Sequence, residues 1–453
     1  MYHSRPGLMS DKADELQRAL NAAGQEVVQD NIPLKKAMHP LTRELGYTAP
    51  LLPPATDANL IIYKHKETGI VQFVFPVHAS QPLFQGGAGM ANHTFAFIRP
   101  LQFGLPIANI SNWVGTALKI PIMTVAEDAI DKIALVVEKK IKPNEGFINI
   151  PADYKQPATL ADLKKAKGKV LLFVHGIFSS INAAFSELGD PKTNNTTMNT
   201  LVDAYSGKIF GYDHWTISKP PLTNALNLLD AIPDDANWDI DVVCHSRGGL
   251  VVRSLACVLK PRQIPVNSDL TKVDLKRRGK IRSIGKTIFV AAANQGSPLA
   301  DPDEIRDFLN VGAFLASTTE CFALDVVIGL ARTLVAAGFD LPSVQELATT
   351  STLVSDLNQA KSIISNKNVY GARADFDYNQ SVLLDAGAVL DKLLMLVDND
   401  LVVPYAGVAS PNPTIPDNRL LNFGSPQAKQ GKVWHTEFFS QPDTHSFLTR
   451  NLP

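Results

Sequence analysis

Charge, cysteine and long apolar runs are all scarce in this chain of 453 residues. Charged residues make up 19% of it, and 43 Lys and Arg nearly balance 44 Asp and Glu. Because phosphate backbones are bound by a basic excess, this balance argues against nucleic acid as a partner. Three scattered cysteines (Cys244, Cys257 and Cys321) can neither staple a chain this long nor predict a metal site. The core must therefore form by apolar burial, which a hydrophobic fraction of 45% allows.

No segment has the pattern of a secretory signal or of a membrane span. Residues 1–14 lack an apolar core followed by a small-residue cleavage site. The most apolar stretch, Phe322–Phe339, is interrupted by Asp325 and Arg332, whereas a span needs about 20 apolar residues with almost no charge. These features predict a cytoplasmic protein without a transmembrane segment, and export without a cleavable signal stays open.

The first 150 residues predict a mixed α/β side domain. Leu60–Tyr63 and Ile70–Phe75 flank Lys-Glu-Thr-Gly and indicate a β-hairpin, and Thr94–Ile98 indicates a further strand. Apolar residues at helical spacing over 130–141 predict a helix. The glycine cluster at 86–89 is not a nucleotide fingerprint, because no strand–glycine–helix unit surrounds it. This region therefore indicates no ligand.

From about residue 168 the pattern changes to short apolar runs separated by helical segments. The run Lys169–Val174 is typical of a strand buried on both faces of a parallel sheet. Alternating strands and helices predict a doubly wound, mostly parallel α/β sheet, with functional residues at the carboxyl ends of the strands. Further strands are expected at Lys208–Tyr212, Asp239–Cys244, Lys286–Ala292, Val369–Phe376 and Lys432–Phe439, and helices at Ala183–Leu188, Leu222–Ala231 and Gly248–Leu259.

The sequence around Ser246 carries the sharpest functional pattern. The expected strand ending at Cys244 leads directly into Cys-His-Ser-Arg-Gly (residues 244–248), and a helix follows. This is the context of a nucleophile elbow, in which small flanking residues allow a tight turn that lifts the serine hydroxyl clear of the sheet. Gly248 meets that need, while Cys244 stands where the G-x-S-x-G pattern has glycine. The Arg247 amide would then face a developing oxyanion.

With this motif the chain resembles the α/β-hydrolase superfamily, in its lipase and esterase branch, over residues 168–453. Phe173–Ser179 (FVHGIFS) is similar to the His-Gly loop of lipases, and the resemblance implies that the Ile177 amide is the second oxyanion donor. Residues 294–300 (NQGSPLA) are similar to another lipase segment. The resemblance implies catalysis without a cofactor or a catalytic metal, and for a calcium ion near residues 398 and 400 the sequence offers no ligand set.

The acid that would partner Ser246 is expected late in the chain. Residues 397–404 (VDNDLVVP) resemble the lipase segment in which Asn-Asp precedes a hydrophobic pair. The resemblance implies Asp400 as the acid of a catalytic triad, with Asp398 as the alternative. A long stretch separates Asp400 from the strand Val369–Phe376, with a helix expected near Leu383–Leu396.

Two late histidines are candidates for the base. His435 falls inside the expected strand Lys432–Phe439, where alternation would fix it on one sheet face. His445 lies beyond that strand, in a segment whose His-Ser-Phe pattern resembles the histidine segment of this lipase branch, and a loop there could reach Ser246. We therefore expect His445 to be the base. His245, beside the nucleophile, is expected to point away from the site.

Residues 299–366 interrupt the alternating pattern and are apolar in their middle. From Phe308 to Gly338 the only charged residues are Glu320, Asp325 and Arg332. In lipases an insertion at this point forms a cap over the nucleophile, and such a cap would give an apolar cleft suited to an acyl chain. Ordinary core helices are the alternative for this segment.

Together these features predict a serine hydrolase that cleaves carboxylic esters with apolar acyl groups through an acyl-enzyme on Ser246. An acyltransferase with the same triad and a non-catalytic interaction module with this fold remain as alternatives. The expected partner is a small-molecule or lipid ester, and transient contact with a lipid surface stays open. The predicted organisation is an N-terminal mixed α/β extension (residues 1–150) and a hydrolase domain (168–453) that contains the cap (299–366).

Overall fold

The computed structural model describes two groups of residues. Between residues 26 and 120 it describes the backbone of seven strands, and the other described ranges are 144–177, 179–216, 218–258, 268–300, 342–376, 398–400, 402–424 and 433–453. The chain divides into two compact units, with the early strands in one and the larger sheet in the other. Among the described residues, no helix combines the length and the apolar character needed to cross a bilayer.

The early strands form two antiparallel sheets. One has the order β1-β7-β4-β5 and the other the order β2-β3-β6. The predicted hairpin is confirmed, because β4 pairs antiparallel with β5, as is the predicted strand at β6. The predicted helix over 130–141 lies outside the described residues. The strands are β1 (Glu26–Ile32), β2 (Lys35–Met38), β3 (Leu45–Pro50), β4 (Ala58–His65), β5 (Val71–Val74), β6 (Phe95–Ile98) and β7 (Trp113–Ile120).

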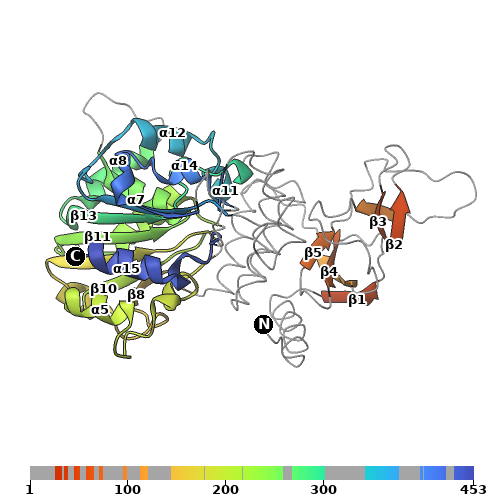
Figure 1. Cartoon of the computed structure of the whole chain (residues 1–453), viewed down its shortest axis with the longest axis horizontal. Helices are drawn as coiled ribbons and strands as arrows, with labels where there is room; N and C mark the ends of the chain where they lie inside the picture. The colour runs from red at the N-terminus through yellow and green to blue at the C-terminus, as the bar shows by residue number, and fades with distance from the viewer. Residues whose placement is uncertain are drawn as a thin grey trace, which may run out of the picture. The chain divides into compact units, whose positions relative to one another are not determined.

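The larger unit is built on a seven-stranded, mostly parallel sheet (Figure 1). Its order is β16-β15-β13-β11-β9-β10-β8, and only β8 runs antiparallel to its neighbour. The predicted doubly wound α/β sheet is therefore confirmed. The strands are β8 (Gly146–Asn149), β9 (Lys169–Val174), β10 (Ile209–Asp213), β11 (Trp238–His245), β13 (Ile281–Val290), β15 (Val369–Ala374) and β16 (Leu420–Phe423).

The edges of this sheet differ from the prediction. The expected strand Lys432–Phe439 is wrong: residues 433–437 form coil and turn, and a short 3-10 helix, η7 (Phe438–Ser440), follows. The edge position belongs to β16 instead, which pairs with β15. At the other edge, β8 starts the sheet at Gly146, ahead of residue 168 and inside the region assigned to the N-terminal extension.

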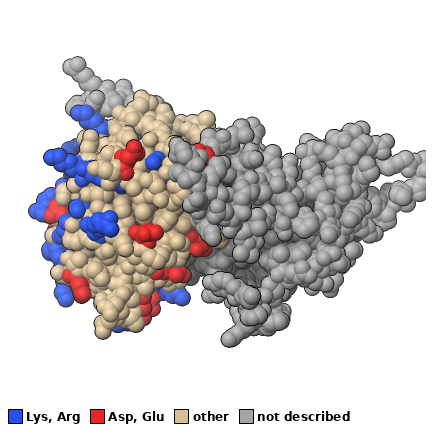
Figure 2. Space-filling view, viewed as in Figure 1, with Lys and Arg blue, Asp and Glu red and all other residues tan. Residues whose placement is uncertain are grey.

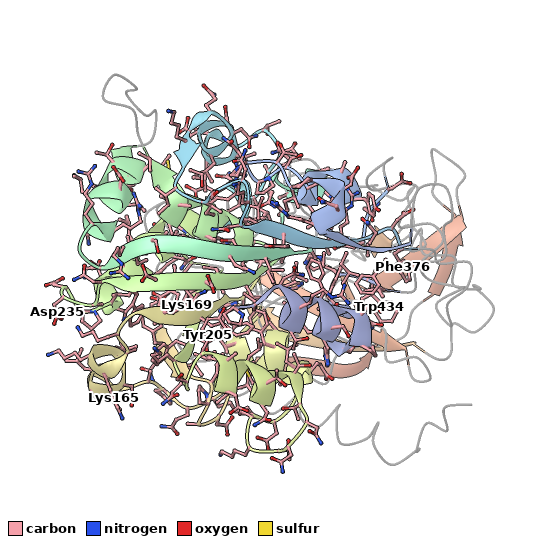
Figure 3. All side chains as sticks on the ribbon, turned by 60° about the vertical axis from the view of Figure 1, so that its left-hand side comes forward. Lys165, Lys169, Tyr205, Asp235, Phe376 and Trp434 are labelled. Atoms are coloured by element: carbon pink, nitrogen blue, oxygen red, sulfur yellow. The ribbon has the colours of Figure 1, made fainter. Side chains whose placement is uncertain are left out.

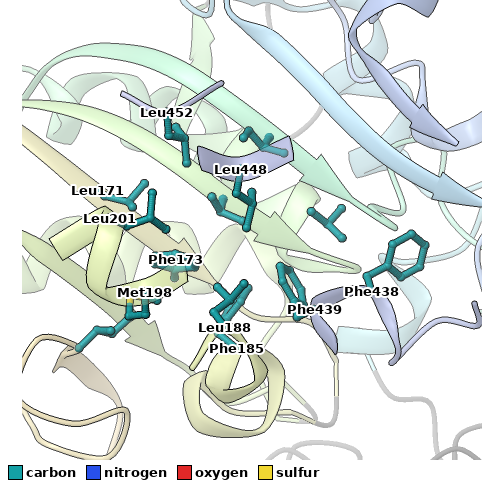
Figure 4. Close-up of a cluster of buried hydrophobic side chains, with 14 of the residues drawn as sticks. Leu171, Phe173, Phe185, Leu188, Met198, Leu201, Phe438, Phe439, Leu448 and Leu452 are labelled. Carbon is teal, nitrogen blue, oxygen red and sulfur yellow. The ribbon is translucent and has the colours of Figure 1, made fainter. Parts of the chain in front are cut away.

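Helices cover both faces of the sheet because its central strands are apolar on both sides. Five of the six residues of β9 are fully buried. Its residues Leu171 and Phe173 pack in one cluster with Phe185, Leu201 and Leu448, which come from the helices on that face (Figure 4). Full burial of each such side chain stabilises the fold by roughly 1.5–3 kcal/mol. The helices on this face are α4 (Ile181–Phe185), α5 (Thr197–Ala204) and α15 (Pro442–Asn451).

The helices α6 (Pro221–Ala231), α7 (Gly248–Ala256) and α8 (Ser268–Arg277) pack against one another, and α7 also contacts β9 and β11. The predicted cap lies outside the described residues from 301 to 341. The later part of that interval is built into the sheet domain, since α12 (Thr352–Gln359) contacts α7 and buries three apolar side chains.

The two ends of the sheet have different chemistry (Figure 3). Lys165 and Asp235 lie at the amino ends of the strands, where exposed cations pair with carboxylates, as Lys167 does with Asp235 at 3.3 Å. On the face shown in Figure 2, Lys and Arg side chains are likewise interspersed with Asp and Glu. Phe376 and Trp434 lie at the carboxyl ends, where their rings meet edge to face at 5.6 Å. The candidate site is at this second end.

Candidate active site

Ser246 occupies a strained turn between β11 and α7. Its φ angle is +55°, in the left-handed region that residues other than glycine rarely adopt. Such a conformation costs on the order of 1–3 kcal/mol and persists only where the surroundings hold it. Here the Ser246 N–H donates to the Val290 carbonyl at 3.1 Å, and the Ser246 carbonyl accepts from Ala293 N at 3.2 Å. The predicted strand–turn–helix at Ser246 is thus present.

The turn leaves no room for larger residues around the serine. A Cβ atom added at Gly248 would lie 2.6 Å from the Val174 carbonyl oxygen, so α7 begins directly against the end of β9. A Cβ added at Gly176 would lie 2.6 Å from the Ser246 Cβ. Cys244, at the remaining small position, is fully buried, with Sγ 3.7 Å from the Ile288 carbonyl oxygen. Cysteine is small enough to replace glycine at that point.

His435 joins Ser246 to Asp400. Its Nε2 lies 2.8 Å from the Ser246 Oγ, and its Nδ1 lies 2.9 Å from the Asp400 Oδ2. A carboxylate only accepts hydrogen bonds, so Nδ1 carries the proton and Nε2 is left to accept from the serine hydroxyl. The three side chains form one hydrogen-bonded chain that could move a proton from Ser246 to His435.

The structure thus places His435, and not the expected His445, in contact with Ser246. His445 lies in the first turn of α15, and its Nε2 is 2.6 Å from the Phe439 carbonyl oxygen. Pro442 at the start of α15 is the signal that sequence reasoning missed, because proline favours the first position of a helix. Because α15 begins at residue 442, His445 is part of that helix and its backbone position is fixed there. His435 lies in the coil and turn at 433–437, where its side chain can approach the serine.

Asp400 is held by its own loop. Its Oδ1 accepts from the backbone N–H of Val402 at 3.0 Å and of Val403 at 2.7 Å, which leaves Oδ2 for His435. Backbone donors fix the carboxylate without competing for the imidazole. Asp398 is the alternative acid. Its backbone carbonyl accepts a hydrogen bond from Tyr405 N at 2.8 Å.

The long stretch between β15 and Asp400 is closed at its base. Phe376 N donates to the Asn399 carbonyl at 2.9 Å, so the two ends of the intervening segment meet at the carboxyl end of β15. The helix expected near Leu383–Leu396 lies outside the described residues. The segment 294–300 supports the same loop, because Ser297 Oγ donates to the Val402 carbonyl at 2.6 Å.

The two predicted oxyanion donors lie on segments that flank Ser246. Ile177 follows Gly176, whose backbone packs against Ser246, and Arg247 is the next residue after the serine. His175, fully buried, has its Nδ1 2.8 Å from the Gly176 carbonyl oxygen. The buried Arg247 side chain donates to the Lys219 carbonyl. The Arg247 contact joins its segment to a distant one, and the His175 segment is held by the His214 N–H, which donates to the His175 Nε2 at 3.2 Å.

The site is almost completely withdrawn from water. Ser246, His435 and Asp400 expose 2%, 5% and 1% of their surface. Low polarity around hydrogen-bonded groups strengthens their electrostatic interactions. Within the described ranges, no group of three or more His, Cys, Asp or Glu side chains could hold a metal ion.

The sheet order, with its antiparallel edge strand and the strained serine turn at the central strand, defines an α/β-hydrolase fold. Residues 146–453 match the family described as a domain of unknown function, DUF7379, and the chain belongs to that family. No curated protein matches the chain.

Several solved structures are similar to parts of the chain. The mature form of the Bacillus licheniformis lipase BlEst2 is 16% identical over 63% of this chain and 92% of its own, with a TM-score of 0.35. Lipase 1 from Pelosinus fermentans is 15% identical over 63% and 97%, with a TM-score of 0.38. EstA from Clostridium botulinum is 13% identical over 73% and 99%, with a TM-score of 0.40. The fold assignment rests on the sheet and the turn themselves.

Proposed function

We propose that the chain is a serine hydrolase that cleaves carboxylic esters with apolar acyl groups. The observation that carries this proposal is the unbroken hydrogen-bond chain from Asp400 through His435 to Ser246. A buried serine on a strained turn, in contact with an imidazole oriented by a carboxylate, is the arrangement that nucleophilic catalysis requires.

In the proposed reaction, Ser246 Oγ attacks the ester carbonyl carbon while His435 Nε2 takes its proton. Collapse of the tetrahedral intermediate breaks the bond to the alkoxy oxygen, which receives the proton back from His435 and leaves as the alcohol. Water then attacks the acyl-enzyme with the same base, which releases the carboxylic acid and restores Ser246. Asp400 keeps the imidazole in the required tautomer and stabilises its charged form.

The backbone N–H groups of Ile177 and Arg247 are the proposed oxyanion donors. Negative charge on the former carbonyl oxygen develops only in the tetrahedral state, so donors fixed in advance act on the transition state rather than on the substrate. The hydrogen bonds from the His214 N–H to His175 and from Arg247 to the Lys219 carbonyl support this role, because each joins a donor segment to a distant part of the domain.

The preference for apolar acyl groups is proposed from the sequence of the interval 308–338. Only three charged residues occur there, and an apolar composition of this kind suits an acyl chain. The proposed substrates are therefore small-molecule or lipid esters.

An acyl-chain panel with the matching serine variant tests the proposal. The full chain should release p-nitrophenol from acyl esters, faster for longer apolar chains than for acetate, and should be labelled by a fluorophosphonate. Ser246→Ala should lose both activities while it keeps the thermal unfolding transition of the wild type. Unchanged turnover in that variant, or no labelling of the wild type, contradicts the proposal.

A further inference from the structure

His245, the last residue of β11, contacts the main chain of His435. Its Nε2 lies 2.9 Å from the His435 carbonyl oxygen. The side chain is expected from the sequence to point away from the site, but it contacts the backbone of His435. Carbonyl oxygens only accept, and Nε2 therefore carries the proton. The ring lies 4.8 Å from the His435 ring and meets Phe439 edge to face at 5.7 Å.

The contact completes a set of attachments around His435. Its backbone N–H donates to the Asp400 carbonyl at 3.0 Å, and its carbonyl accepts from His245. The residue has no helix or strand of its own to hold it, because 433–437 are coil and turn. Hydrogen bonds on both sides of its Cα therefore supply the rigidity that an imidazole needs to meet Ser246 at 2.8 Å.

His245 is suited to be a neutral donor. Burial, with the neighbouring His435 as a second cause, lowers the pKa of His245 to about 3 against the smaller opposing effect of its own hydrogen bond. It therefore carries no charge at ordinary pH. Its Nδ1 is buried and makes no hydrogen bond within the described part of the chain, so no second partner draws the ring away from His435.

We infer that His245 is a positioning residue that fixes the main chain of His435 and so aligns its imidazole between Ser246 and Asp400. This inference rests on the proposed function and assigns a role to a residue outside the triad. A side chain that replaces His245 must place its hydrogen-bond donor where Nε2 lies, at the far side of the ring from Cβ. A glutamine amide reaches that position, whereas an asparagine amide is shorter and does not.

The two amides therefore form a matched pair of variants. His245→Asn should lower kcat by about 10–100-fold with little change in KM, because a small misplacement of a reacting group slows the chemical step without weakening binding. His245→Gln should recover most of that loss. If the asparagine variant does not fold, His245→Phe keeps the ring without the donor and should show the same loss.

A double-variant comparison separates positioning from damage to the turn. In a His435→Ala background, His245→Asn should cause no further loss of the residual activity, because that background lacks the imidazole that His245 positions. Equal losses for Gln and Asn, or a full additional loss in the His435→Ala background, overturn the positioning role. The same assay first measures the wild type and Ser246→Ala. If the wild type has no esterase activity, or if Ser246→Ala keeps it, the proposed function is overturned, and with it this inference.

Discussion

His435 is bound to Asp400 twice, once through its side chain and once through its backbone. The Nδ1–Oδ2 distance is 2.9 Å, and the backbone N–H of the histidine donates to the backbone carbonyl of the aspartate at 3.0 Å. Two residues 35 positions apart thus behave as one unit, because a shift of either loop would break both bonds. The unit contacts Ser246 at a single point, the His435 Nε2.

The two late histidines give opposite expectations. His435→Ala should lower kcat for an acyl ester by roughly 10⁴–10⁶-fold, since it removes the imidazole hydrogen-bonded to the Ser246 hydroxyl. His445→Ala should stay within a few-fold of the wild type and should cost about 1 kcal/mol of stability, for the lost bond to Phe439. Steady-state kinetics and denaturant unfolding measure the two. An inactive, folded His445→Ala variant would instead identify His445 as the base.

Asp400→Asn should lower kcat by about 10⁴-fold with the fold intact, because an amide can still accept from Val402 and Val403 but can present its NH₂ to His435, which favours the wrong tautomer. Asp398→Asn is the matched control. Asp398 contributes its backbone carbonyl to this region, and the substitution leaves that bond intact. Comparable losses in the two variants would argue against Asp400 as the acid.

Gly176→Ala should disable the site by displacing the nucleophile. The new Cβ would lie 2.6 Å from the Ser246 Cβ, well inside normal contact, so one of the two segments must move. Gly407→Ala is a matched control, since its nearest neighbour would be at 3.6 Å. Thermal unfolding of Gly176→Ala in the wild type and in a Ser246→Gly background measures the clash directly. A stability loss that is identical in the two backgrounds would place the clash elsewhere.

Glu346 predicts a pH-dependent stability. Burial raises the pKa of Glu346 to about 7, although Arg247 and a backbone hydrogen bond from Leu222 act in the opposite direction. Because the folded state holds this proton above pH 4.5 and the unfolded state does not, the contribution of Glu346 to stability falls as the pH rises from about 4.5 to about 7. The loss is up to roughly 3 kcal/mol.

Glu346→Gln removes this titration. Urea unfolding at several pH values should show the variant gaining stability relative to the wild type from about pH 4.5 to about pH 7. Below pH 4.5 the two proteins should have parallel curves, since the carboxyl is then protonated in both states. A difference between wild type and variant that does not change with pH would contradict the raised pKa.

The features that sequence predicts well here are local ones. The strand into Ser246 and the helix after it are set by adjacent residues, and the burial of β9 follows from a run of six residues. Residues 397–404 predict Asp400 as the acid, and the Asp400 Oδ2 lies 2.9 Å from the His435 Nδ1. In each of these places the pattern and the structure span the same few residues.

The features that sequence misses depend on contacts between distant segments. The alternation around His435 is typical of a strand, yet β16 takes the edge of the sheet and leaves residues 433–437 as coil. The role inferred for His245 depends on a carbonyl 190 positions away, for which no local pattern exists. The sequence likewise places the edge strand β8 in the N-terminal region, because its partner β10 lies some sixty residues later.

The hydrogen bond between Phe376 and Asn399 should let the chain tolerate insertions and deletions between these two residues. The ends of the segment it joins are held together by this bond. Evolution could thus insert or delete residues there while Asp400 keeps its register with His435. Homologous chains should differ most in length at that point, and it is where a foreign segment could be grafted to alter substrate choice without rebuilding the chemistry.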